Sequence, residues 1–213
     1  GRGDAVSVLV AHGNVGRFAD WARAWTEVED QLGPLDILVN NAGITRDGFF
    51  HKMSHDQWSD VIRVNMDSVF NMTRQVINGM RDRGHGRIVN ISSINGPKCQ
   101  IGQTNYSAAN ARMHGLTQAL ALEMASVKVN VNSICPGLVD TERVGFIADA
   151  IRPAGVSAEE HRLAMLEANS RSVPLGRTAV ATDVADTAAF LASDQSAFLT
   201  GLAISVSGGK GMQ

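Results

Sequence analysis

Short runs rich in apolar residues alternate with longer amphipathic stretches along this chain. The runs at 6–11, 37–39, 87–91, 129–134 and 202–206 predict buried strands. Between them, apolar residues recur every three or four positions, which is the period of a helix with one buried face. Strands that alternate with such helices imply a parallel sheet covered on both faces, so the sequence predicts a doubly wound, Rossmann-like α/β fold.

One predicted helix carries an apolar stripe and ends at Gly33-Pro34. The stripe consists of Phe18, Trp21, Trp25, Val28 and Leu32. Because such stripes usually face the core, we assign the two tryptophans to the core rather than to a ligand site.

Two further helices open at capping boxes, in which a serine and the residue three positions later cap the helix reciprocally. Ser54 with Gln57 opens a long helical pattern. Ser157 with Glu160 opens another one, inside an irregular stretch at 138–181. We interpret that stretch as a lid over the edge of the sheet.

The loops that follow the predicted strands are the expected location of a site. In open parallel sheets, ligands bind beyond the carboxyl ends of the strands, where the chain turns toward its helices. That rule selects the loops at 14–15, 40–43, 92–96 and 135–139.

Composition narrows the class of protein. The chain has 213 residues, of which 44% are hydrophobic and 19% charged, and we expect a single folded domain over 1–213. Lys and Arg total 19 against 21 Asp and Glu, a net charge of −2, which argues against nucleic acid as the main partner. No apolar run is long enough to span a membrane and the first residues lack a signal-peptide pattern, so we expect no membrane partner and a cytoplasmic location.

The sequence offers no set of metal ligands. Cys99 and Cys135 lie far apart and form no C-x-x-C pair. His114 shares a helix face with Asn110, but no second ligand is spaced with it, so we expect a structural histidine and no metal.

Three motifs in strand-to-helix contexts carry a family resemblance. Asn40-Asn41-Ala42-Gly43 follows one strand, Ser93 ends another, and Tyr106 opens the next helix. In this order they resemble the short-chain dehydrogenase/reductase family. The run from Asn41 to about Leu122 is most similar to acetoacetyl-CoA and 3-oxoacyl reductases.

The resemblance implies a catalytic set. Tyr106 would donate its phenolic proton to a carbonyl oxygen as hydride arrives from a nicotinamide cofactor. Ser93 would hydrogen-bond the same oxygen and stabilise its developing charge. Asn65 matches a helix asparagine that holds a water in the proton relay, and Asn110 occupies a fourth catalytic position.

The resemblance also implies the residues that hold NADP or NAD. The small residues near the adenosine would let the backbone approach a flat ring closely. The adenosine side would consist of Asn14, Val15, Asn40, Ala42 and Gly43. The nicotinamide end would consist of Pro136, Gly137, Val139 and Thr141, with Ile91 beneath the ring and Tyr106 beside it. The residue that distinguishes NAD from NADP belongs to the missing upstream part of the pattern.

Two features depart from the family pattern. The opening strand and glycine-rich turn that hold a diphosphate find no match, because Gly13-x-x-Gly16 follows the wrong strand. We therefore expect an N-terminally incomplete domain that lacks its first βαβ unit, about 30 residues. In addition, Asn110 stands where the Tyr-x-x-x-Lys pattern needs lysine, and the lost charge would slow turnover roughly tenfold to a thousandfold.

We expect an oxidoreductase that moves hydride between the cofactor and a small-molecule carbonyl or secondary alcohol, most closely a 3-oxoacyl reductase. A polyol or sugar-alcohol dehydrogenase is an alternative, because the segment 140–174 resembles the longer lid of those enzymes and Leu138 makes the entrance apolar. A catalytically silent cofactor-binding or scaffold subunit is a second alternative, motivated by Asn110. The family also implies a homotetramer, in which the helices that start near Trp58 and Tyr106 pair between subunits.

Overall fold

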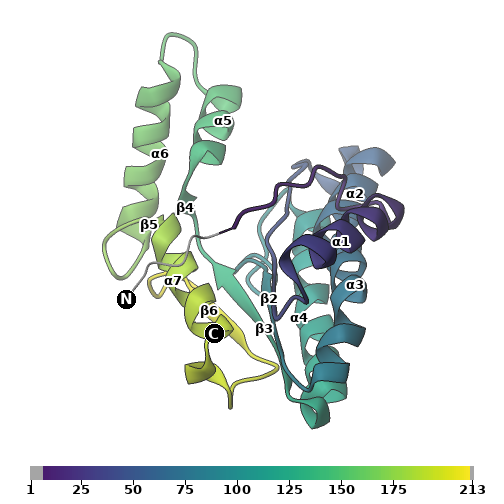
Figure 1. The fold of residues 1–213 in the computed structure, drawn as a ribbon. Coiled ribbons are helices and arrows are strands. Elements are labelled where there is room, and N and C mark those ends of the chain that lie inside the picture. The colour runs from purple at the N-terminus through teal and green to yellow at the C-terminus, as the bar shows by residue number, and fades with distance from the viewer. Residues whose placement is uncertain (1–6, 212–213) are drawn as a thin grey trace.

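A four-stranded parallel sheet forms the centre of the protein (Figure 1). The computed structural model describes residues 7–211, apart from the side chains of residues 23 and 24. The strands are adjacent in the order β1 (Ile37–Asn40), β2 (Gly86–Ile91), β3 (Val129–Pro136) and β6 (Ala203–Val206). The predicted parallel α/β architecture is therefore confirmed.

Helices cover both faces of the sheet. Neighbouring side chains of a strand point to opposite faces, and both faces carry apolar side chains that the helices bury. Ile88 belongs to a core cluster with Met80 and Val131, whereas Val89 packs on the other face with Ile134 and Leu191. The helices of the first face are α3 (Ser68–Arg83) and α4 (Thr104–Met124), with α1 (Phe18–Leu32) against α3 and α2 (His55–Ile62) against α4. The second face is covered by α7 (Ala181–Ala192).

Both predicted capping boxes are formed. The Ser54 hydroxyl accepts from the Gln57 amide nitrogen at 3.1 Å, while the Gln57 side chain accepts from the Ser54 amide at 2.9 Å. Ser157 and Glu160 make the same reciprocal pair. The predicted long helix after Ser54 is formed without a break from 55 to 83, and it contains a π-helical turn at Arg63–Asp67 between α2 and α3.

The predicted lid is a pair of helices that stands away from the sheet (Figure 1). It consists of α5 (Glu142–Ile151) and α6 (Ala158–Ser172), which pack against each other. The strands β4 (Val139–Asp140) and β5 (Ala179–Val180) pair in parallel at its base. Short 3₁₀ turns complete the structure at Phe50–Lys52, Ala125–Val127 and Asp194–Ser196.

The predicted strand at 6–11 is wrong for its described part. Residues 7–11 form no strand, and Val8 and Val10 are 78% and 71% exposed; Val6 lies outside the described residues. A strand needs a neighbour, and within residues 7–211 the outer edge of β1 pairs with nothing. Residues 7–11 therefore pair with no strand among the described residues.

The apolar stripe of α1 is only partly covered. Trp25 packs against the first core cluster, as predicted, and Trp21 is partly buried beside Gly13. The two ends of the stripe, Phe18 and Leu32, remain nearly half exposed. No helix among residues 7–211 combines the length and the apolar character that crossing a bilayer requires.

Candidate active site

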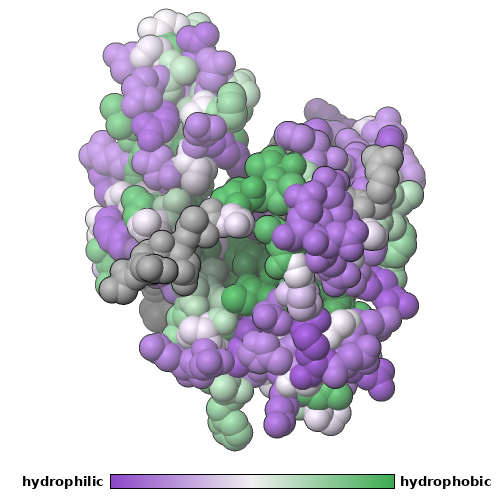
Figure 2. Space-filling model, viewed as in Figure 1, coloured by the Kyte–Doolittle hydropathy of each residue, from purple (hydrophilic) through white to green (hydrophobic). Residues whose placement is uncertain are grey.

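A cavity of about 580 Å³ opens at the carboxyl ends of β1, β2 and β3. Its floor comes from the loops after these strands, and its outer wall comes from α5 and α6. Figure 2 shows the hollow between the two parts of the molecule, with hydrophobic surface inside it. The apolar residues of the wall are Val144, Ile147, Ile151 and Met165. The cavity therefore lies where a parallel sheet is expected to bind its ligand.

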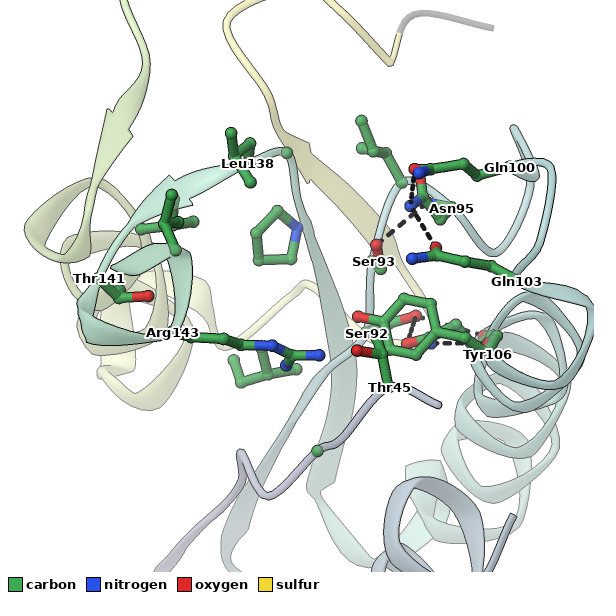
Figure 3. Close-up of a pocket in the computed structure, with 18 of the residues that line it drawn as sticks. Thr45, Ser92, Ser93, Asn95, Gln100, Gln103, Tyr106, Leu138, Thr141 and Arg143 are labelled. Atoms are coloured by element: carbon green, nitrogen blue, oxygen red, sulfur yellow. Dashed lines mark hydrogen bonds between the residues drawn. The ribbon is translucent and has the colours of Figure 1, made fainter. Parts of the chain in front are cut away.

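Tyr106 and Ser93 meet in this cavity. Tyr106 stands in the first turn of α4 and is half-buried, while Ser93 follows the end of β2 and is buried. Figure 3 shows both side chains on the same side of the hollow. The Ser93 hydroxyl oxygen accepts from the Asn95 amide nitrogen at 3.1 Å, so its own proton is free to be donated to a ligand oxygen.

Asn65 lies on the π-helical turn and lines the same cavity. Its side chain is buried and bonded twice to one residue of the loop after β1. The Asn65 Oδ1 accepts from the Ile44 amide nitrogen at 2.8 Å, and its Nδ2 donates to the Ile44 carbonyl at 3.0 Å. Asn65 therefore fixes the loop that carries Gly43. Single π turns inside helices are frequent at functional sites, and nothing in the apolar periodicity reveals this one.

Asn110 lies one helical turn after Tyr106 and is only 2% exposed. Its Nδ2 donates to the Tyr106 carbonyl oxygen at 2.8 Å, and its Oδ1 accepts from the Ser92 hydroxyl at 3.3 Å. The side chain is thus satisfied by its own helix and by the end of β2. It brings no charge to the cavity.

His114 and Cys135 lie beneath the floor of the site. The His114 Nε2 is 3.0 Å from the Ser92 Oγ and 3.2 Å from the Cys135 Sγ. Burial lowers the pKa of His114 and raises the pKa of Cys135 to about 11, although hydrogen bonds to Ser92 and Ser133 partly oppose the latter shift. Both groups are therefore uncharged at neutral pH. Residues 7–211 contain no cluster of three or more side chains suited to holding a metal ion.

Most of the predicted cofactor-binding residues line the cavity together with the catalytic set. They are Ala42, Gly43, Ile91, Pro136, Gly137, Val139 and Thr141. Several are small, and a Cβ added at Gly137 would lie 3.4 Å from Ser207, an ordinary van der Waals contact. The volume, the glycines of the lining and the neighbouring hydroxyl groups fit the nicotinamide end of a dinucleotide.

Three predicted adenosine-side residues lie outside the cavity. Asn40 is buried and donates from its Nδ2 to the Asn90 Oδ1 at 2.9 Å, on the face of β1 that also carries Leu38. The Asn14 side chain caps its own turn, and the Val15 carbonyl accepts from Asn71 at 3.0 Å. Their role toward an adenosine stays a prediction.

The cavity also holds polar residues that motif reasoning did not assign. Asn95 donates to the Gln103 Oε1 at 2.9 Å, and the Gln103 Nε2 donates to the Asp47 carboxylate at 2.9 Å. Gln103 and Asp47 belong to the segments that carry the family resemblance, so the sequence held a signal for them. Arg143 reaches the cavity from α5, inside the irregular stretch where no motif indicated a site residue (Figure 3).

Comparison with known proteins identifies the family. The family model described as short chain dehydrogenase matches residues 2–151. The acetoacetyl-CoA reductase of Rhizobium meliloti (strain 1021) is 51% identical over 183 residues, which cover 86% of this chain and 70% of that protein. The acetoacetyl-CoA reductase of Allochromatium vinosum is 46% identical over 206 residues, covering 97% and 78% respectively. The 3-oxoacyl-[acyl-carrier-protein] reductase of Escherichia coli (strain K12) is 39% identical over 183 residues, covering 86% and 69%.

These matches confirm the resemblance carried by the motifs around Gly43, Ser93 and Tyr106. An oxidoreductase that uses a nicotinamide cofactor follows from the same relationship. The chain belongs to the short-chain dehydrogenase family.

Proposed function

We propose that this protein reduces the 3-oxo group of an acyl-CoA thioester such as acetoacetyl-CoA. The observation that carries the proposal is the convergence of Ser93 and Tyr106 on one cavity, beside the 136–139 loop. The names of the relatives at 46% and 51% identity support a 3-oxoacyl thioester over a polyol. The apolar wall of α5 and α6 suits an acyl chain better than a polyhydroxylated one.

Two side chains act on the carbonyl oxygen. A bound nicotinamide cofactor supplies the hydride, which forms the new bond to the carbonyl carbon. Tyr106 donates its phenolic proton to the oxygen, so that the carbonyl becomes a secondary alcohol. Ser93 donates a hydrogen bond to the same oxygen and stabilises the negative charge that develops there. Asn65 holds the loop at Ile44 that forms the adjoining wall.

The test is a substrate comparison with both NADPH and NADH. We expect the purified protein to consume reduced cofactor with acetoacetyl-CoA, and to show far lower turnover in the oxidative direction with a panel of polyols. The reverse preference would assign a polyol dehydrogenase. Binding of reduced cofactor without turnover on any substrate would indicate a catalytically silent subunit. The uncharged Asn110 is the feature that motivates this alternative.

We further propose a homotetramer in which the helix that starts near Trp58 and continues into α3 pairs between subunits, together with α4, which starts near Tyr106. Phe70 on α3 is 57% exposed and Leu122 on α4 is 82% exposed, so both helices present apolar side chains to the outside. Light scattering coupled to size-exclusion chromatography measures the mass directly. A monomer mass, or an unchanged mass in Leu122→Glu, would contradict this assembly.

A further inference from the structure

Two basic side chains line the cavity, and neither forms an ion pair with an acidic side chain among residues 7–211. Arg143 lies in the first turn of α5 and reaches into the hollow from the side opposite Tyr106 (Figure 3). Lys210 lines the same cavity from the loop after β6. Neither residue takes part in the proposed proton transfer.

Arg143 is free to bind a ligand. Within residues 7–211, no carboxylate lies within 4.0 Å of its guanidinium and no hydrogen bond to it is formed. The nearby acids are occupied by other groups. Asp140 accepts from Arg162 at 2.7 Å, and Asp47, the single described carboxylate on the cavity wall, accepts from Gln103 at 2.9 Å.

Lys210 adds positive charge to the same wall. Its Nζ donates to the Asn169 Oδ1 at 2.6 Å, while its backbone carbonyl accepts from the Lys98 Nζ at 2.8 Å. Burial, and then the neighbouring charge of Lys98, lower the pKa of Lys210. A negatively charged ligand in the cavity would favour the charged form of Lys210 and so oppose the lowering of its pKa.

We propose that Arg143, with Lys210 as a second cation, binds a phosphate group of the molecule that fills the cavity. The planar guanidinium matches the geometry of phosphate oxygens and forms strong, charge-assisted hydrogen bonds with them. The inference rests on the proposed function, under which two phosphate-bearing ligands enter the cavity. The phosphate belongs either to the diphosphate of the cofactor or to the coenzyme A part of the substrate.

Arg143→Gln removes the charge and keeps most of the side chain. Arg152→Gln is the matched control, because Arg152 ends the same helix and pairs with Asp149 rather than lining the cavity. The first measurement is the Kd of the reduced cofactor, determined from nicotinamide fluorescence in the absence of substrate. The second is the KM for acetoacetyl-CoA against the KM for the acetoacetyl thioester of N-acetylcysteamine, which carries no phosphate.

The two measurements separate the sources of the phosphate. If it is the cofactor's, Arg143→Gln weakens cofactor binding about tenfold to a hundredfold, the loss of one charge-assisted contact. If it is the substrate's, the KM for acetoacetyl-CoA rises by about that factor and the KM for the phosphate-free thioester stays constant. Arg143→Lys is expected to restore part of either loss, because it returns the charge without the planar fork.

The proposal is overturned if Arg143→Gln leaves the Kd and both KM values within the range of Arg152→Gln. The same holds if the KM rises equally for both thioesters, which would indicate a general change in the shape of the cavity. In either case the unaltered protein would still turn over acetoacetyl-CoA, so the proposed function would stand. If the unaltered protein binds no reduced cofactor and turns over no thioester, both the proposed function and the phosphate-binding proposal are wrong.

Discussion

The side-chain amide of Asn110 donates a 2.8 Å hydrogen bond to the carbonyl oxygen of Tyr106, one helical turn earlier. A lysine at position 110 would instead place a positive charge near the phenol and stabilise the phenolate left when the proton is donated. We expect Asn110→Lys to raise kcat about tenfold or more. Steady-state turnover on acetoacetyl-CoA with saturating cofactor measures this change.

Asn110→Met is the matched control, because methionine is of similar length to lysine but has no charge. It removes the hydrogen bonds to Tyr106 and Ser92 and should not raise kcat. Equal turnover in the lysine and methionine variants would show that charge at this position is irrelevant to the reaction.

Removal of the Tyr106 hydroxyl tests the proton transfer itself. Tyr106→Phe keeps the ring in the cavity and should lower kcat by about a hundredfold or more, the usual worth of a general acid. Ser93→Ala should lower kcat by about a hundredfold through the lost stabilisation of charge on the oxygen. Both variants are expected to bind reduced cofactor, which nicotinamide fluorescence measures. Full activity in Tyr106→Phe would show that another group donates the proton.

Asn65 contributes to stability as well as to the wall of the site. Asn65→Ala would leave the amide and carbonyl of Ile44 unpaired, which should lower the free energy of unfolding by about 2–4 kcal/mol. Urea unfolding followed by circular dichroism measures the loss. Asn71→Ala removes a single bond to the Val15 carbonyl and should cost about 1 kcal/mol, so equal losses in the two variants would contradict this account.

The half-buried His114 makes stability depend on pH. Burial lowers its pKa in the folded state, so the unfolded chain binds the proton more readily. Its contribution to stability is therefore complete above about pH 6.5, the unfolded pKa, and is lost as the pH falls below it. The unfolding midpoint in urea should fall between about pH 7.5 and pH 5.5, and His114→Gln should reduce that fall. The exposed His51 provides the control variant, His51→Gln. The assignment to His114 is refuted if the urea midpoint depends on pH as before in His114→Gln and less strongly in His51→Gln.

Periodicity and turn signals were sufficient to predict β1, β2, β3, β6 and the two capped helices, because those features are local. The strand predicted at 6–11 is wrong over residues 7–11, since a strand depends on a neighbour that the pattern of one segment does not contain. The π-helical turn that carries Asn65 is also invisible to periodicity. The order of the motifs predicted that Ser93 and Tyr106 share one site, but it could not reveal Arg143, whose position depends on where the α5–α6 pair stands relative to the cavity.

The alternation of burial along β1 determines which face of the sheet carries the Asn40 side chain. Burial alternates along β1, with Leu38 and Asn40 buried and their neighbours exposed. A period of two therefore assigns Asn40 to the core face, where it bonds Asn90 and Thr73. Asn40 is not among the residues that line the cavity.

The outer edge of β1 has a consequence for how the molecule behaves in solution. Ile37 and Val39 are each 45% exposed on this strand, which has no neighbour on that side among residues 7–211. Free amide and carbonyl groups beside apolar side chains form a template on which another extended segment can add. Aggregation through this edge will therefore increase with protein concentration. A segment that paired with the outer edge of β1 would protect the sheet from it.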